Sequence, residues 1–289
     1  MESKIILITG ATSGIGKAAA KALAQQGHTV ILHGRNKTKT ESLCEEIKSE
    51  SGNTNIDILL GDMFLLSDVK KMADEFKAKY QKLDVLINNA GGTMGKTREV
   101  TNENMEKTIV LNLLAPFLLT ELLLGVMAQS SDARIINVSS EMHKFGGKPL
   151  FDDFQLEQNY DSVRAYGLAK LYLIWISRHL AADLKQKNME HITVNTVHPG
   201  VSNTNFGLDA DRGFFTNFIG KLLMAFSLTP EQGAESVVYL ASSDDVKNVT
   251  GKYYAPKKKL AKASDKYYSA KNESIVWDYC MKICEPYLR

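Results

Sequence analysis

Two residues that can move a proton, Tyr166 and Lys170, lie four positions apart in the chain. The surrounding residues 164–184 predict a helix, and side chains four apart share one helix face. A tyrosine hydroxyl titrates at about 10, which makes it a poor acid at neutral pH. A neighbouring ammonium group favours the phenolate and lowers that pKa, so the pair predicts a tyrosine that works as an acid or base. The same spacing is common on helices, so its meaning depends on the rest of the chain.

A glycine-rich segment, residues 9–16 (TGATSGIG), connects the first predicted strand to the first predicted helix. Gly10 permits a tight turn, Gly14 lets the backbone approach a pyrophosphate, and Gly16 lets the helix pack closely on the sheet. The helix start offers free N–H groups and a positive dipole end to phosphates. The turn residues expected to contact a dinucleotide are Gly10, Ser13, Gly14, Ile15 and Gly16. The alternative is a glycine turn with a purely structural role.

The end of the second predicted strand indicates which nicotinamide cofactor fits. A cofactor with a free ribose 2′-hydroxyl normally meets an acidic residue about 20 positions after the glycine turn. No acidic residue occurs between Glu2 and Glu41, and Arg35 and Lys37 stand where the acid would be expected. Arginine pairs with a 2′-phosphate through two parallel hydrogen bonds, so the sequence favours NADP(H). The alternative is that Arg35 is a solvated loop charge.

Alternating strands and helices would bring these residues to one edge of a sheet. Apolar runs rich in β-branched residues predict strands at residues 4–9, 29–32, 56–60, 84–87, 133–138 and 192–197. Helical patterns cover residues 17–26, 40–50, 67–80, 105–127 and 164–184. Alternation of this kind predicts right-handed crossovers, a parallel sheet and helices on both faces. With no linker or repeat, we expect a single α/β domain of the doubly wound Rossmann type.

Composition excludes several classes of protein. The 289 residues are 44% hydrophobic and 24% charged, which suits a globular enzyme and excludes a disordered or fibrous chain. A net charge of +2 is too small to suggest a nucleic-acid partner. The histidines form no metal-ligand pattern, and three cysteines without framework spacing argue against a secreted disulfide scaffold. No signal peptide or bilayer-spanning apolar run is recognised, so we expect a cytoplasmic protein without a metal.

Four motifs occur in register: TGATSGIG at residues 9–16, NNAG at 88–91, YGLAK at 166–170 and PGVSNT at 199–204. Each is weak alone, but together they resemble the short-chain dehydrogenase/reductase family over residues 4–251. The resemblance implies hydride transfer between a nicotinamide cofactor and a carbonyl or alcohol substrate. It assigns residues 1–251 to the Rossmann-fold catalytic domain and residues 252–289 to a C-terminal helical extension of that domain.

The resemblance also implies further cofactor contacts. The residues expected at the adenine are Asp62, through its side chain, and Met63, through its backbone N–H. Those expected along the adenosine ribose are Asn89, Ala90 and Gly91. Those expected around the nicotinamide are Pro199, Gly200 and Val201, with Thr204 at the carboxamide or the phosphates.

The catalytic roles that the resemblance implies centre on Tyr166, which would donate its proton to the carbonyl oxygen as hydride reaches the carbonyl carbon. Ser140, the second serine of a pair, would hold that oxygen, with Ser139 as the alternative. Lys170 would hold the nicotinamide ribose. The backbone carbonyl of Asn112 would hold a water that relays the proton onward; the alternative is that Asn112 is an ordinary polar helix residue.

The spacing before Tyr166 points to one branch of the family. Ser140 and Tyr166 are 26 positions apart, about twice the usual distance. The extra residues 142–161 resemble an insertion in retinol dehydrogenases and light-dependent protochlorophyllide reductases. His143 and residues 151–154 (FDDF) suit the retinol dehydrogenases in particular. That branch implies large apolar substrates such as retinal, other lipid aldehydes or sterols.

Residues 205–228 are predicted to form an apolar flap over a small-molecule carbonyl or alcohol substrate. Its apolar residues are Phe206, Phe214, Phe215, Phe218, Ile219, Leu222, Leu223 and Phe226. The flap suits a long apolar chain or a membrane surface; the alternative is a helix packed on the core. We expect no N-terminal anchor of the kind found in the membrane-bound retinoid enzymes, so small aldehydes or ketones stay open as substrates.

The C-terminal residues 274–283 predict a helix with Cys280 on its buried side, and residues 257–259 (KKK) predict a solvated turn. A homodimer is possible, because many relatives pair through helices. The leading function is an NADP(H)-dependent carbonyl reductase. The alternatives are an NAD-dependent alcohol dehydrogenase and a non-catalytic NADP(H)-binding regulator. The last of these would be expected to have lost Tyr166 or Lys170.

Overall fold

A computed structural model describes residues 2–200 and 228–289 of the chain. An eight-stranded sheet in the order β3-β2-β1-β4-β5-β6-β7-β8 forms its centre. Strands β1 to β7 are parallel, and β8 runs antiparallel to β7. The strands are β1 (Ile5–Ile8), β2 (Thr29–Gly34), β3 (Ile56–Leu60), β4 (Val85–Asn88), β5 (Ala133–Val138), β6 (Ile192–Val197), β7 (Tyr253–Ala255) and β8 (Lys259–Ala261). The strand order reverses between β1 and β4, and ligands of such sheets bind beyond the carboxyl ends of the strands at that point.

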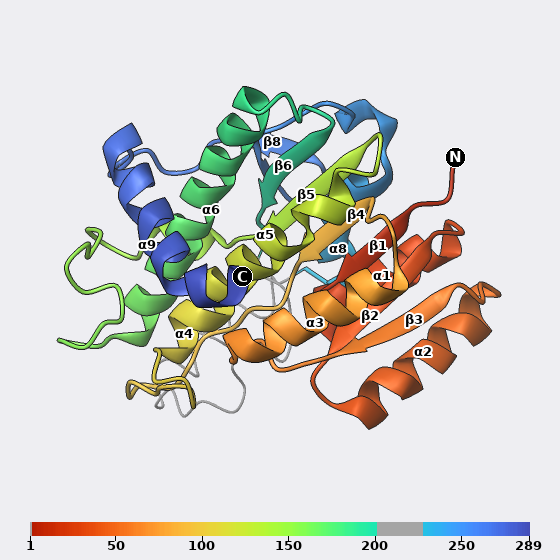
Figure 1. The fold of residues 1–289 in the computed structure, drawn as a ribbon, viewed down its shortest axis with the longest axis horizontal. Coiled ribbons are helices and arrows are strands. Elements are labelled where there is room, and N and C mark those ends of the chain that lie inside the picture. The colour runs from red at the N-terminus through yellow and green to blue at the C-terminus, as the bar shows by residue number, and fades with distance from the viewer. Residues whose placement is uncertain (1, 201–227) are drawn as a thin grey trace.

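Helices cover both faces of this sheet (Figure 1). Successive residues of a strand point to opposite faces, so Leu7 packs in one core cluster while Ile6 and Ile8 pack in the other. All three side chains are fully buried, which explains the continuous apolar run in the sequence. The helices over the face of Ile6 and Ile8 are α1 (Gly14–Gln25), α2 (Lys37–Ser51) and α8 (Pro230–Ser242). Those over the face of Leu7 are α3 (Leu66–Lys79), α5 (Ala115–Met127), α6 (Ser162–Gln186) and α9 (Ala270–Leu288).

This arrangement confirms the predicted Rossmann-type α/β fold, and all six predicted strands are present. The sequence argument missed α8, β7 and β8. The two strands have three residues each, too few to show alternation. For α8 a signal was present: Thr229 and Gln232 form a reciprocal capping box, with Pro230 in the first turn.

The predicted helix over residues 105–127 is present in three pieces. Glu106 caps the short helix α4 (Lys107–Ile109) by accepting hydrogen bonds from the backbone N–H groups of Thr108 and Ile109. A π-helical turn, η1 (Val110–Leu114), follows and leads into α5. A single π-turn inside an α-helix is uncommon and often marks a functional position.

The stretch Lys107–Met127 is long and apolar enough to cross a membrane, which corrects the expectation that no such run exists. Of its most apolar window, 67% is buried inside the fold. Core helices of soluble proteins pass the same test of length and composition, so this is weak evidence for a membrane span.

Helix α9 extends the predicted C-terminal helix at both ends and lies against α5 and α6 (Figure 1). Val276, Cys280 and Cys284 lie on its inner face and are fully buried. Trp277 packs edge-on against Phe117 of α5, with ring centroids 5.0 Å apart. Residues 252–289 therefore share the core of the main sheet instead of forming a loose tail.

The insertion at residues 142–161 begins with the 3-10 helix η2 (Glu141–Lys144) and continues as a loop. Phe154 is buried and stacks on Tyr279 of α9, with ring centroids 3.9 Å apart. Gln155 donates a hydrogen bond to the Tyr279 hydroxyl and accepts one from the backbone N–H of Glu106. The second half of the insertion thus ties α9 to the start of α4. The expected apolar flap lies outside the described residues, apart from Leu228.

Candidate active site

The glycine-rich turn joins the end of β1 to the start of α1. Gly10 and Gly14 have positive φ angles of 64° and 53°, which glycine adopts without strain. A methyl group added at Gly16 would lie 2.4 Å from the carbonyl oxygen of Gly10, so only glycine fits there. Ser13 precedes the helix and makes no capping hydrogen bond, and Ile15 lies in its first turn. The backbone is therefore bare where a phosphate would approach a helix start.

The NNAG segment lies directly against this turn. Asn89 Nδ2 donates to the carbonyl oxygens of Thr9 (2.8 Å) and Gly10 (3.2 Å). The Thr9 hydroxyl oxygen accepts from the backbone N–H groups of Asn89 and Ala90, both at 2.9 Å. Thr9, which the sequence argument did not select, thus joins the ends of β1 and β4.

His33 is a second residue that the sequence argument missed. It lies at the end of β2, and its Nδ1 accepts from the backbone N–H of Gly10 at 3.1 Å. A backbone N–H can only donate, so the ring proton lies on Nε2, which donates to the carbonyl oxygen of Gly61 at 3.1 Å. Burial lowers the pKa of His33 to about 4. A neutral imidazole therefore connects the glycine turn to the end of β3, and a polar residue in the apolar run TVILHG was its only signal in the sequence.

The expected adenosine residues gather beyond β2 and β3. Arg35 Nη1 lies 3.6 Å from Asp62 Oδ2, and the guanidinium lies over the Phe64 ring, 5.9 Å from its centroid. The Arg35 side chain is 68% exposed, so it is open to a ligand. Met63, between Asp62 and Phe64, is buried. Next to Arg35, Asn36 caps α2, whose first residue is Lys37.

Gly91, an expected cofactor contact, lies close to the expected catalytic residues Asn112 and Lys170. A methyl group added there would lie 2.8 Å from Asn112 Oδ1 and 3.0 Å from Lys170 Nζ. Asn112 lies in the π-helical turn and is fully buried. Its side chain donates to the carbonyl oxygens of Gly92 (2.9 Å) and Thr108 (2.8 Å) and accepts from the backbone N–H of Gly92 (3.0 Å). The side chain of Asn112 therefore fixes the segment that follows β4 against the π-helical turn η1.

Ser140 faces Tyr166, and Ser139 does not. The Ser140 side chain forms a hydrogen bond with Tyr166, which lies on the second turn of α6 and is buried. The Ser139 hydroxyl donates to the backbone carbonyl of Lys170 at 3.0 Å. Lys170 Nζ donates to the carbonyl oxygen of Val138 at 2.8 Å and lies 5.7 Å from the centroid of the Tyr166 ring.

Burial dominates the pKa values of this pair, contrary to the simple expectation from their spacing. It raises the pKa of Tyr166, while the hydrogen bond from Ser140 opposes part of that rise. It lowers the pKa of Lys170 to about 7. The expected depression of the tyrosine pKa by a nearby ammonium is therefore wrong for this geometry, because burial of the phenol outweighs it.

The segment after β6 is described only as far as Gly200. Gly200 has a φ of 82°, and a methyl group added there would lie 2.8 Å from the Leu228 side chain. Pro199 and Gly200 follow the carboxyl end of β6. This strand pairs in parallel with β5, so both strands end at the same edge of the sheet. The expected contacts Val201 and Thr204 lie outside the described residues.

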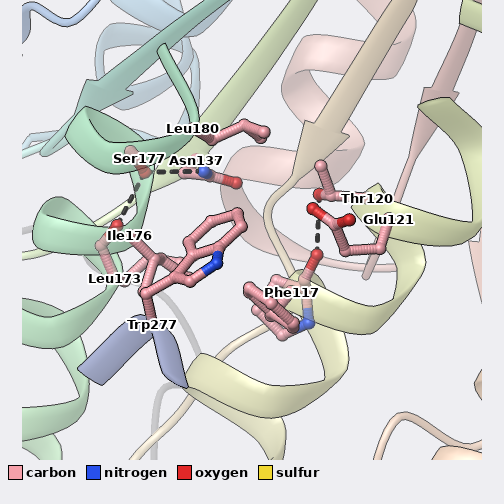
Figure 2. A pocket seen from close by; sticks show the side chains of 10 residues that line it. Phe117, Thr120, Glu121, Asn137, Leu173, Ile176, Ser177, Leu180 and Trp277 are labelled. Carbon is pink, nitrogen blue, oxygen red and sulfur yellow. Dashed lines mark hydrogen bonds between the residues drawn. The ribbon is translucent and has the colours of Figure 1, made fainter. Parts of the chain in front are cut away.

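A small cavity elsewhere in the fold is separate from this site (Figure 2). It lies between α5, α6 and α9, where Phe117, Glu121 and Trp277 line it. Burial raises the pKa of Glu121 to about 7. Among the described residues, none expected to bind cofactor or substrate lines this cavity, and we assign it no catalytic role.

Comparisons with known proteins, by sequence and by structure, all lead to dehydrogenases or to proteins of the same fold. The sequence model of the short chain dehydrogenase family matches residues 4–212. Retinol dehydrogenase 14 of Homo sapiens is 35% identical, over 96% of this chain and 85% of that protein. Polyprenol dehydrogenase of Homo sapiens is 33% identical, over 98% of this chain and 84% of that protein. A solved structure of an uncharacterized protein from Mycobacterium Paratuberculosis has a TM-score of 0.78 at 26% identity, over 98% of this chain and 93% of that one.

The family match spans most of the chain, and the fold and the motif residues have the arrangement described above. The relatives at 33–35% identity cover nearly all of the chain. The chain therefore belongs to the short-chain dehydrogenase/reductase family of oxidoreductases, in its retinol dehydrogenase-like branch.

Proposed function

We propose that this protein is an NADP(H)-dependent reductase of apolar aldehydes or ketones. The observation that carries the proposal is the convergence of Ser140, Tyr166 and Lys170 beside Gly91, at the carboxyl ends of β4 and β5. A dinucleotide fits the residues present, because glycines leave the backbone bare at Gly10, Gly16 and Gly91. When bound, a nicotinamide supplies or accepts a hydride.

The protein's own residues handle the proton and the substrate oxygen. Tyr166 exchanges a proton with that oxygen, and Ser140 holds it by a hydrogen bond. Lys170, with a pKa lowered to about 7, exchanges protons readily at neutral pH. The π-helical turn at Asn112 alters the backbone hydrogen-bond pattern there, which supports a role for its carbonyl oxygen in a proton relay.

Arg35 supports the preference for NADP(H). It is exposed at the end of β2, next to the start of α2, where the helix dipole and Lys37 add positive charge. Its neighbour Asp62 is the expected adenine contact and lies within ion-pair distance. The alternative, an NAD-dependent alcohol dehydrogenase, would use the same catalytic residues without the 2′-phosphate contact.

The apolar substrate class is supported by the relatives. The names of these two human proteins refer to retinol and polyprenol, which are apolar alcohols of isoprenoid type. Reduction of an aldehyde and oxidation of the alcohol are the two directions of one reaction at the same site. Retinal and long-chain aldehydes are therefore the first substrates to test.

The decisive experiment is a fluorescence titration of the purified protein with NADPH and with NADH, for the wild type and for Arg35→Ser. We expect the wild type to bind NADPH at least tenfold more tightly than NADH. Arg35→Ser should weaken NADPH by about 10- to 100-fold, the value of a charge-assisted bidentate contact, and leave NADH unchanged. Lys39→Ser, an exposed charge further along α2, is the matched control. Equal binding of both cofactors by the wild type would instead favour the NAD-dependent alcohol dehydrogenase.

A further inference from the structure

A buried histidine beside Ser140 has no part in the function proposed above. His143 lies in η2, at the start of the insertion, and only 2% of its surface is exposed. The carbonyl oxygen of Ser140 accepts two hydrogen bonds from this one residue. The backbone N–H of His143 donates at 3.1 Å, and its ring Nδ1 lies 2.7 Å away.

The second ring nitrogen determines which atom carries the proton. Nε2 of His143 lies 3.0 Å from the backbone nitrogen of Ser264, in the segment between β8 and α9. A backbone N–H can only donate, so Nε2 is the acceptor and carries no proton. The proton of the neutral ring is then on Nδ1, which donates to Ser140. Burial lowers the pKa of His143 and keeps the ring in this neutral form.

The ring therefore connects the backbone of Ser140 to the C-terminal part of the chain. Ser140 is in an extended conformation, and its hydroxyl oxygen also accepts from the backbone N–H of Met142 at 3.2 Å. The direction of the Ser140 hydroxyl toward Tyr166 depends on this local backbone. A misplacement of about 1 Å in a catalytic group costs about 100-fold in rate.

We infer that His143 is a positioning residue, whose Nδ1–H holds the Ser140 carbonyl and thereby keeps the Ser140 hydroxyl facing Tyr166. The bond from Ser264 serves to fix the ring. The inference rests on the proposed function only in so far as Ser140 acts on the substrate. It gives residues beyond β8 a part in shaping the active site.

Two substitutions of His143 distinguish the hydrogen bond made by Nδ1 from the one made by Nε2. In His143→Asn the side-chain amide replaces Nδ1 and can still donate to Ser140, while the contact to Ser264 is lost. In His143→Gln the longer amide replaces Nε2 and can still accept from Ser264, while the bond to Ser140 is lost. With NADPH and decanal, we expect kcat to fall about tenfold in His143→Gln and less than threefold in His143→Asn. The dissociation constant for NADPH should be the same in both variants and the wild type.

Thermal unfolding of both variants distinguishes positioning from simple destabilisation. If kcat follows the melting temperature instead of the Ser140 bond, or if the Asn variant is the slower one, the inference is wrong. A nitrogen-15 NMR spectrum of the wild-type histidines needs no variant, and a proton on Nε2 of His143 would also overturn it. If the wild type reduces no aldehyde, the proposed function fails separately, and the NMR result still tests the geometry of the ring.

Discussion

Tyr166 and Lys170 are both buried, and burial acts on their pKa values in opposite directions. The phenol becomes a weaker acid, and the pKa of the lysine falls to about 7. Burial thus brings the pKa of the lysine down toward neutral pH, which eases proton transfer to and from its amine. The tyrosine stays protonated until the substrate oxygen needs a proton, which suits reduction of a carbonyl.

Replacing Tyr166 with Phe removes the proton donor and leaves the ring in place. We expect kcat to fall by about 10²- to 10⁴-fold, the usual contribution of a general acid. Binding of NADPH should change less than twofold, since the ring still fills its site. Tyr172→Phe is the matched control, because this buried tyrosine on the same helix bonds only the backbone N–H of Leu150 among the described hydrogen bonds. Loss of NADPH binding in Tyr166→Phe would contradict the assigned role.

The low pKa of His33 predicts that the folded protein loses stability as the pH falls. Its pKa is about 4 in the folded protein against 6.5 for an unperturbed histidine. Between these values the unfolded chain binds the extra proton, so stability rises with pH through this window and is lost as the pH falls. His33→Asn keeps an acceptor for Gly10 and cannot gain a proton. The loss of unfolding free energy from pH 7.5 to pH 5, measured in urea, should be smaller in this variant by about 2 kcal/mol. An unchanged loss would show that His33 does not carry this dependence.

At the scale of elements, the start of α1 has no room for a side chain. Gly16→Ala would place a methyl group 2.4 Å from the Gly10 carbonyl oxygen, so the turn must move. We expect a loss of about 1–3 kcal/mol in stability, as for overpacked core positions, together with weaker NADPH binding. Gly125→Ala on α5 is the control: it is exposed, meets nothing within 4 Å, and should stabilise the helix by about 0.5–1 kcal/mol. Equal effects of the two substitutions would show that the close approach at Gly16 does not limit the turn.

Elements that bury a regular pattern were predictable from the sequence, and those held by tertiary contacts were not. The run KIILIT predicts β1 because each face of that strand meets its own core cluster. The π-helical turn at Asn112 has no periodic signal, because a single extra residue in one turn hardly alters an apolar helix. The described residues of the four motifs, which end at Gly200, lie at the carboxyl ends of the strands, as the parallel sheet requires. The structural roles of His33 and His143 were not predictable, because they depend on bonds to backbone groups far away in the sequence.

At the scale of the whole molecule, the C-terminal helix α9 is the main element beyond the sheet and the helices that connect its strands. Helix α5 is apolar on nearly every side, and α9 covers it together with α3. The Trp277 ring of α9 meets Phe117 of α5 (Figure 2). It also stacks on His179 of α6, with ring centroids 4.4 Å apart. The insertion binds the same helix through Phe154 and Tyr279. Detachment of α9 would therefore expose a continuous apolar surface on α5 and α6.

Val276→Asp tests whether α9 is needed by the whole fold. Val276 is fully buried on the inner face of α9, and an unpaired carboxylate there costs several kcal/mol. We expect the melting temperature to fall by more than about 10 °C, because 1 kcal/mol shifts it by at least 2 °C in a chain of this size. Size-exclusion chromatography should show oligomers, because the freed apolar face on α5 and α6 would pair between molecules. Lys282→Asp places the same charge on the exposed side of α9 and should resemble the wild type in both measurements. If Val276→Asp is as stable and as monodisperse as Lys282→Asp, then α9 contributes little to the core, and the link from Ser264 to the active site loses its rigid support.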